Sequence, residues 1–323
     1  MSKVTRSTMY LGLWLGVLLM GTLIFTAGCS SRYTFYQRVY VTSGQSAAVF
    51  EVPNNSGNIN IIPVANLTGA ATGLDAPNSI AFDFNNNAYI TNFSGNSVTI
   101  YSRGSNGNAT PVATISGANT GLDGPSGIAL DYQNNIYVAN SLNNTITIYA
   151  AGASGNATPT GTIGGSNTGL DYPTGLAIGG YGKTIYVANQ AGNSIEVFNS
   201  AIPGNVAPTN TISGVNTGLA GPNALILDNY SNIFVTNGSG NSITIYSPGT
   251  TGNTAPVATI SGSSTGLSNP SGIAVDAFGD IYVGNKSTVD IFAPIPAGTT
   301  NVAPVATISG SNTGLGTVVG LAL

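Results

Sequence analysis

The chain has 323 residues, of which only 6% are charged, and it contains one cysteine and no histidine. A single cysteine excludes disulfides within the chain and a thiolate metal site. The lack of histidine excludes Ser-His-Asp and Cys-His catalysis and histidine-bearing zinc sites. The formal net charge is −4 and no basic cluster is present. We therefore expect no nucleic-acid partner, because phosphate binding needs Lys or Arg side chains.

Residues 1–28 have the pattern of a secretory signal, with Lys3 and Arg6 before an apolar run over 9–25. Thr26-Ala-Gly-Cys29 resembles a bacterial lipobox, which implies cleavage before Cys29 and lipidation of its thiol. An uncleaved anchor is the alternative, because residues 9–28 could just span a bilayer. Residues 29–38 would be the lipidated cysteine and a short tether. We expect an exported protein, lipid-anchored to a bacterial membrane, and in a Gram-negative cell to the outer membrane or the cell surface.

The rest of the chain is a tandem repeat. The tripeptide Thr-Gly-Leu recurs at intervals of 48 or 49 residues, with its leucine at Leu74, Leu122, Leu170, Leu219, Leu267 and Leu315. Each interval holds four short segments rich in β-branched and aromatic residues, separated by Asn, Gly and Ser clusters. No window in this region has the apolar periodicity of a helix. Four strands per repeat is typical of β-propeller blades.

The two ends of the repeat region predict how the ring closes. Five full blades are expected at about 78–117, 126–165, 174–214, 223–262 and 271–310. Residues 39–69 match a blade that lacks its first strand, and residues 316–323 match a lone first strand. Together they would form a composite sixth blade, a 3+1 closure. The expected fold is an all-β, six-bladed propeller that forms one domain over residues 39–323.

The motif Pro125-Ser-Gly-Ile-Ala-Leu-Asp131, followed by Asn135-Ile-Tyr-Val-Ala-Asn140, resembles the NHL repeat of six-bladed propellers. The resemblance covers residues 39–323 and implies the fold. It implies little about function, because such propellers include lyases, lactonase-type enzymes, scaffolds and extracellular binding domains. The lyases of this group bind metal through histidine, which this chain lacks.

Two polar positions recur once per blade and are candidate site residues. The first ends the innermost strand, where a ring of carboxylates could bind a hard cation such as Ca²⁺ or could cap its own hairpins. Its members are Asp83, Asp131, Asp228 and Asp276. The second ends the next strand, where amides could bind a ligand or could serve turn formation. Its members are Ser43, Asn92, Asn140, Asn189, Asn237 and Asn285.

A third recurring position is aromatic and ends the third strand. Packing between blades accounts for it, and a platform for sugar stacking is the alternative. Its members are Phe50, Tyr101, Tyr149, Phe198, Tyr246 and Phe292.

These patterns favour a membrane-tethered, non-enzymatic scaffold that binds an envelope protein or a glycan and needs no cofactor. A metal-dependent, lactonase-like or lyase-like enzyme using the aspartates is a second hypothesis. A structural component of the cell envelope is a third.

Overall fold

The computed structural model describes residues 36–53 and 57–323. The predicted signal, Cys29 and most of the tether lie outside these residues. No helix within the described ranges is long and apolar enough to cross a membrane. Their helices are three short 3₁₀ turns, η1 (Ala70–Thr72), η2 (Gly180–Gly182) and η3 (Ser263–Thr265).

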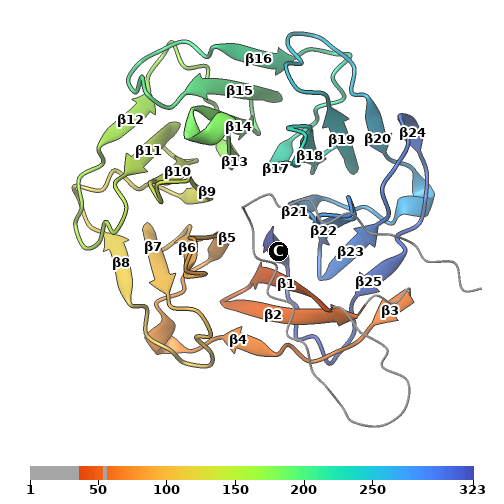
Figure 1. Cartoon of the computed structure of the whole chain (residues 1–323), viewed down its shortest axis with the longest axis horizontal. Helices are drawn as coiled ribbons and strands as arrows, with labels where there is room; N and C mark the ends of the chain where they lie inside the picture. Colours follow the sequence, from red (N-terminus) through yellow and green to blue (C-terminus); the bar gives the residue numbers. More distant parts are fainter. Residues whose placement is uncertain (1–35, 54–56) are drawn as a thin grey trace, which may run out of the picture.

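In the part of the chain that the structure describes, six antiparallel sheets surround a central axis (Figure 1), which confirms the predicted six-bladed propeller. The first strand of each full repeat is innermost, and the chain then moves outward. Listed from the inside outward, the first full blade contains β5 (Pro77–Phe82), β6 (Ala88–Asn92), β7 (Ser97–Tyr101) and β8 (Ala113–Ser116). The second contains β9 (Pro125–Leu130), β10 (Ile136–Asn140), β11 (Thr145–Tyr149) and β12 (Gly161–Gly164). The third contains β13 (Pro173–Gly179), β14 (Thr184–Asn189), β15 (Ser194–Asn199) and β16 (Asn210–Ser213). The fourth contains β17 (Pro222–Leu227), β18 (Ile233–Asn237), β19 (Ser242–Tyr246) and β20 (Ala258–Ile260). The fifth contains β21 (Pro270–Val275), β22 (Ile281–Asn285), β23 (Thr288–Phe292) and β25 (Ala306–Ile308).

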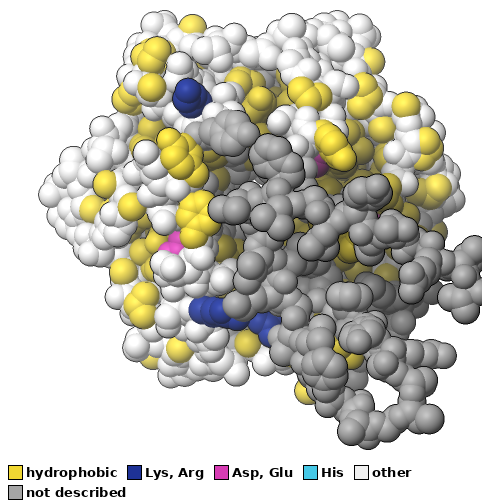
Figure 2. All heavy atoms as spheres, viewed as in Figure 1, with side chains coloured by type: hydrophobic (Ala, Val, Ile, Leu, Met, Phe, Trp, Pro, Cys, Tyr) yellow, Lys and Arg dark blue, Asp and Glu magenta, His cyan; other side chains and the backbone are white. Residues whose placement is uncertain are grey.

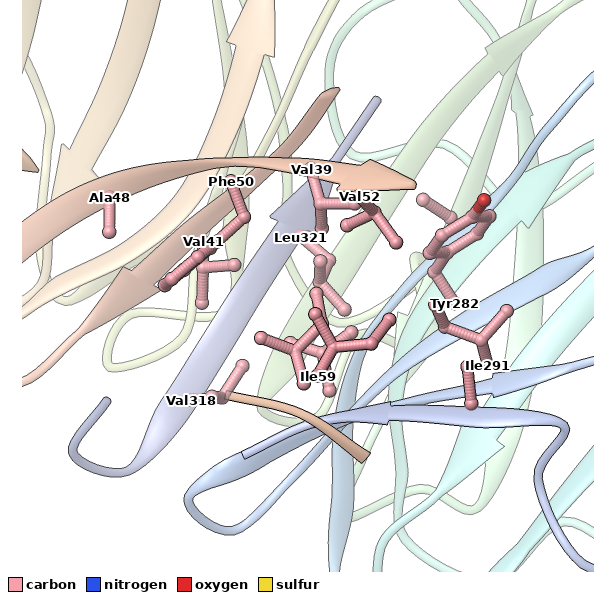
Figure 3. Close-up of a cluster of buried hydrophobic side chains, with 14 residues drawn as sticks. Val39, Val41, Ala48, Phe50, Val52, Ile59, Tyr282, Ile291, Val318 and Leu321 are labelled. Carbon is pink, nitrogen blue, oxygen red and sulfur yellow. The ribbon is translucent and has the colours of Figure 1, made fainter. Parts of the chain in front are cut away.

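The sixth blade joins the two ends of the ring, as the 3+1 closure predicted. From the inside it contains β26 (Val318–Ala322), β1 (Tyr36–Ser43), β2 (Ser46–Pro53) and β4 (Ala65–Leu67). Strand β26 pairs antiparallel with β1, from Tyr40 opposite Ala322 to Ser43 opposite Val318. A buried cluster seals this junction, and Figure 3 shows Val39, Phe50, Val318 and Leu321 gathered there. Closure covers the inner edge of β1, which would otherwise be open for pairing with another chain.

The core consists of apolar side chains that interdigitate between neighbouring blades. The six aromatic residues that end the third strands are at most 1% exposed, so packing accounts for them. Where this residue is tyrosine, its hydroxyl is also satisfied: the Tyr149 Oη donates to the carbonyl of Thr120 at 2.6 Å. Burial raises the pKa of Tyr149 to about 12, so the phenol stays a hydrogen-bond donor at neutral pH.

An outer belt, which the sequence analysis did not predict, links every blade to the next. The outermost strand of each blade makes parallel pairs with a loop or short strand of its neighbour. Two of the six links are regular pairs, β20 with β24 (Gly298–Thr300) and β25 with β3 (Gly57–Ile59). The other four in the described chain are single bridges, for example Ile115 with Gly155. The β25–β3 link crosses the junction of the chain ends, so the ring is closed both at its centre and at its circumference.

Candidate functional site

The two ends of the propeller differ in the loops that they carry. The end with the hairpins 83–87, 131–135, 179–183, 228–232 and 276–280 is called the hairpin face. The opposite end carries the linkers between blades and the hairpins from the second to the third strand, and is called the linker face. Tyr36 and Leu323 both lie at the hairpin face, because β1 and β26 pair there.

The aspartates of the predicted ring lie at the hairpin face, where each caps its own hairpin. The Oδ1 atom of Asp83 accepts the backbone N–H groups of Asn85 and Asn87, both at 2.8 Å, and its Oδ2 atom accepts the Asn87 side-chain amide. Asp131 and Asp228 repeat this pattern, and the Oδ1 atom of Asp276 again accepts two backbone N–H groups. The carboxylates therefore have a structural use independent of any ligand.

A cavity of about 420 Å³ opens at the hairpin face and is lined by Asp83, Asp131 and Asp228, together with Phe84 and Tyr132. Among the described residues, no three His, Cys, Asp or Glu side chains come close enough together to hold a metal ion. Ca²⁺ binding by the aspartates therefore stays a prediction, and the observed geometry gives it no support.

The asparagines of the second predicted ring are buried, with exposures of 0–7%. The Asn140 Oδ1 atom accepts the backbone N–H of Asp123 at 3.3 Å, and its Nδ2 atom donates to the hydroxyls of Thr145 and Thr147. Ser43 is buried as well, and its hydroxyl accepts the N–H of Gly316. These side chains pin each linker to its own blade. A ligand-binding role for them stays a prediction, since a ligand could reach these amides only by displacing the linkers.

The sequence analysis missed a cavity of about 410 Å³ at the linker face, named here the linker-face cavity. Its wall includes the residue that follows the first proline of each full blade's inner strand. These residues are Asn78, Ser126, Thr174, Asn223 and Ser271. The pattern was readable in the sequence as a polar residue after each Pro, once per repeat. Several of these side chains also tie neighbouring inner strands together, as when the Ser271 Oγ atom donates to the carbonyl of Val318 at 2.7 Å.

The loops above this cavity add Phe93, Tyr172, Gln190, Asn269 and Lys286 to its wall. Among the residues that the structure describes, no carboxylate side chain lines the cavity, and Lys286 is its one charged side chain. Its rim therefore combines amides, two aromatic rings and one ammonium group.

Three of these rim residues adopt a backbone conformation that normally belongs to glycine. Tyr172 and Asn269 have φ +54° and Lys286 has φ +55°. The position of Tyr172 holds Gly124 and Gly221 in the neighbouring blades, with φ +59° and +61°, and Ala76 and Asn269 in two other blades, with φ +50° and +54°. The left-handed conformation costs a residue with a side chain about 1–2 kcal/mol. Large side chains are thus placed at this cavity against a local preference for glycine.

Comparison with known proteins agrees with the fold. No curated protein sequence matches the chain. A chain of the nidogen/laminin complex has a TM-score of 0.62 and 16% identity, covering 88% of this chain and 97% of that one. A putative 6-phosphogluconolactonase from Bacteroides fragilis has a TM-score of 0.56 and 14% identity, over 90% and 83%. Virginiamycin B lyase from Staphylococcus aureus has a TM-score of 0.50 and 15% identity, over 70% and 69%. At such identities the likeness concerns the fold alone.

Residues 47–218 match the family model described as lactonase, 7-bladed beta-propeller. The resemblance to NHL repeats stays a prediction beside this match. Over half of the chain is matched, so the protein belongs to this lactonase family of β-propellers, and its described residues build six blades.

Proposed function

We propose that the protein is a tethered binding module that holds a carbohydrate, the end of a glycan, in the linker-face cavity. The observation that carries this proposal is the composition of the described cavity wall, with amides, hydroxyls, two aromatic rings, one ammonium group and aliphatic side chains of the inner strands, but no carboxylate. Saccharides present hydroxyl groups that pair with amides and hydroxyls, and they present apolar C–H faces that pack on aromatic rings.

The strained residues support the same site. Backbone strain tends to be kept where a function requires it. Tyr172 and Lys286 both carry it, and both line this cavity. Tyr172 would supply a stacking surface, and Lys286 would donate hydrogen bonds to hydroxyl or carboxylate oxygens of the sugar.

The location of the protein is part of the proposal. The signal pattern and Cys29 favour export and a lipid anchor on a bacterial membrane. The ligand would then be a glycan of the cell envelope or of the surroundings. The module would hold it without chemical change, with Tyr172 and Lys286 serving as binding groups in a described wall that has no carboxylate or histidine.

The test is a glycan array probed with the full chain in detergent. We expect a defined group of saccharides to be retained, and Lys286→Gly to weaken their binding at least fivefold. Glycine suits the φ of this position, as Gly44 does in the composite blade with φ +62°. Lys183→Ala, at the hairpin face, is the control and should bind like the wild type. An array without retained saccharides would overturn the proposal, as would equal losses in the two variants.

Family membership favours a second candidate, lactone hydrolysis. The polar groups for such a reaction would come from the aspartate-lined cavity of the hairpin face. Turnover of sugar lactones in the presence of Ca²⁺, lost on adding EDTA and in Asp131→Asn, would establish this activity. A thermal melt that EDTA and Ca²⁺ leave unchanged would count against it.

A further inference from the structure

Exposed aromatic side chains are concentrated on the hairpin face. The tips of four hairpins carry Phe84, Tyr132, Tyr230 and Phe278, whose exposures range from 57 to 83%. The third full blade has Tyr181 at the corresponding place in the sequence. The hairpin geometry does not depend on these rings, because the Asp of each hairpin already fixes it.

The linker face differs. Its second-to-third-strand hairpins are built mainly from Asn, Ser, Gly and Gln, and the large apolar side chain exposed on them is Leu142, at 55%. The propeller therefore has one face with aromatic tips and one face with polar tips. Charged side chains are sparse, as Figure 2 shows for the face in view.

The chain enters the propeller at the aromatic face. The first described residue, Tyr36, begins β1 at this end and is itself 47% exposed. The preceding 35 residues contain the apolar run 9–25 and Cys29. Whether that segment is a lipidated stub or an uncleaved anchor, it joins the propeller on the side of the four aromatic tips.

We propose that the hairpin face rests on a lipid bilayer, with Phe84, Tyr132, Tyr230 and Phe278 inserted at the level of the headgroups. Aromatic side chains favour this depth, where one end meets the apolar region and the other meets water. The linker-face cavity would then open away from the membrane. This inference depends on the tips and the chain entry, and it holds whether or not the cavity binds a carbohydrate.

The charge of this face specifies the kind of lipid. Its hairpins hold Asp83, Asp131, Asp228, Asp276 and Asp280 with Lys183 as their single cation, and Arg103 follows β7 at the same end, so acidic side chains outnumber basic ones there. Arg38, near the chain entry, is paired with Glu51 at 2.8 Å. An anionic surface attracts basic segments and would repel this face. The docking should therefore be strongest on zwitterionic lipid and weaken as anionic lipid is added.

Flotation with phosphatidylcholine vesicles tests the proposal. Residues 36–323 hold every strand of the described ring, so this piece contains the complete closed fold without the predicted anchor. We expect it to float with the vesicles. A variant with all four tips changed to serine should lose at least tenfold in partitioning, while Leu142→Ser/Val215→Ser on the linker face should stay within twofold. Failure of the wild type to float would overturn the proposal, as would equal losses in both variants.

A single-tryptophan experiment separates insertion from other contacts. Trp14 is the only tryptophan of the chain and is absent from residues 36–323. Tyr132→Trp and Leu142→Trp place one probe on each face at nearly equal exposure, 57 and 55% in the native residues. Brominated phosphatidylcholine should quench the fluorescence of the Tyr132→Trp variant and leave that of the Leu142→Trp variant unchanged. Equal quenching in the two variants would contradict insertion of the hairpin face. A propeller that dimerises through its aromatic tips without binding vesicles would assign this face to a second copy of the chain.

Discussion

At the scale of single residues, one buried asparagine per full blade satisfies a group that the linker backbone leaves unpaired. The linker before each inner strand has a backbone N–H that points into the blade and finds no strand partner within the described chain. The amide oxygen of Asn140 accepts that N–H from Asp123. The sequence showed that this asparagine recurs once per blade. An asparagine that accepts a backbone N–H and one that binds a ligand would recur in the sequence in the same way. Only the burial distinguishes them.

Asn140→Ala should therefore destabilise the fold. It leaves the partly buried N–H of Asp123 without its acceptor, which costs about 1–3 kcal/mol. Chemical denaturation measures the change in the free energy of unfolding. Asn85→Ala is the control, because the Asn85 side chain is exposed at a hairpin tip and its change should stay within about 0.5 kcal/mol. An Asn140→Ala protein that unfolds like the control would show that the amide is not structural.

Asp290 should make stability depend on pH. It is 5% exposed, and burial raises the pKa of its carboxyl, an effect that hydrogen bonds from Asn285, Thr307 and Thr288 partly offset. The folded state then binds a proton more readily than the unfolded state, so this group lowers stability at neutral pH and the penalty disappears as pH falls. In another blade the corresponding position holds Thr147. Its hydroxyl accepts a hydrogen bond from the side-chain amide of Asn140, which corresponds to Asn285.

We expect Asp290→Thr to be more stable than the wild type at pH 7. Its advantage should shrink as the pH is lowered through the pKa of Asp290. Denaturation of both proteins between pH 7 and about pH 4, near the ordinary pKa of an aspartate, gives this difference. An advantage that is constant over this range, or that grows toward low pH, would contradict the raised pKa.

At the scale of elements, the sequence predicted the four strands within each repeat but not the contacts between neighbouring repeats. Four strands per repeat followed from local alternation and turn residues. The outer belt did not, because its parallel pairs join loops to strands of another blade. The chain does repeat Gly-Asn in those loops, as at Gly155-Asn156. A single sequence does not indicate which blade the side chain of Asn156 contacts. The cavity at the linker face was missed for the same reason, since its wall comes from the inner strands and loops of several blades.

The belt makes a specific prediction about two glycines. Gly262 has φ +114°, and a Cβ there would lie 2.5 Å from the Cγ atom of Asn301. Gly249 has φ +76° and would meet no described atom within 4 Å. Both alanine variants incur backbone strain, but only Gly262→Ala must also displace Asn301. Its loss of unfolding free energy should exceed that of Gly249→Ala by about 1–3 kcal/mol.

Equal losses in the two glycine variants would show that Asn301 yields without cost. A double variant, Gly262→Ala/Asn301→Ala, should recover part of the difference if the contact is responsible.

At the scale of the whole molecule, closure depends on the last strand. Removing residues 318–323 opens the inner edge of β1 and exposes the partners of Val318 in the sealed cluster. We expect the truncated protein to melt far below the wild type and to associate through the open edge. A circular permutant that joins Leu323 to Tyr36 by a short glycine-rich linker and begins at Pro77 keeps the β26–β1 pair, and should melt like the wild type. A truncated protein with unchanged melting would refute the closure.

The two ends of the whole molecule also differ, with the aromatic tips and the chain entry at the hairpin face and the linker-face cavity at the opposite end. The sequence predicted the ring and its closure because both follow from a count of repeats. It did not predict the difference between the ends, because the exposure of Phe84 or Tyr132 depends on which ends of the strands the hairpins join.

The central claim is that the linker-face cavity is the ligand site, and Tyr172→Gly tests it most directly. Carbohydrate binding and thermal unfolding would be measured on the same samples of this variant and the wild type. Glycine fits the φ of +54° better than tyrosine does, so we expect the melting temperature to hold or rise while saccharide affinity falls at least tenfold. Unchanged affinity would contradict the account. A large fall in melting temperature would contradict it too, because Tyr172 would then serve the fold and not the ligand.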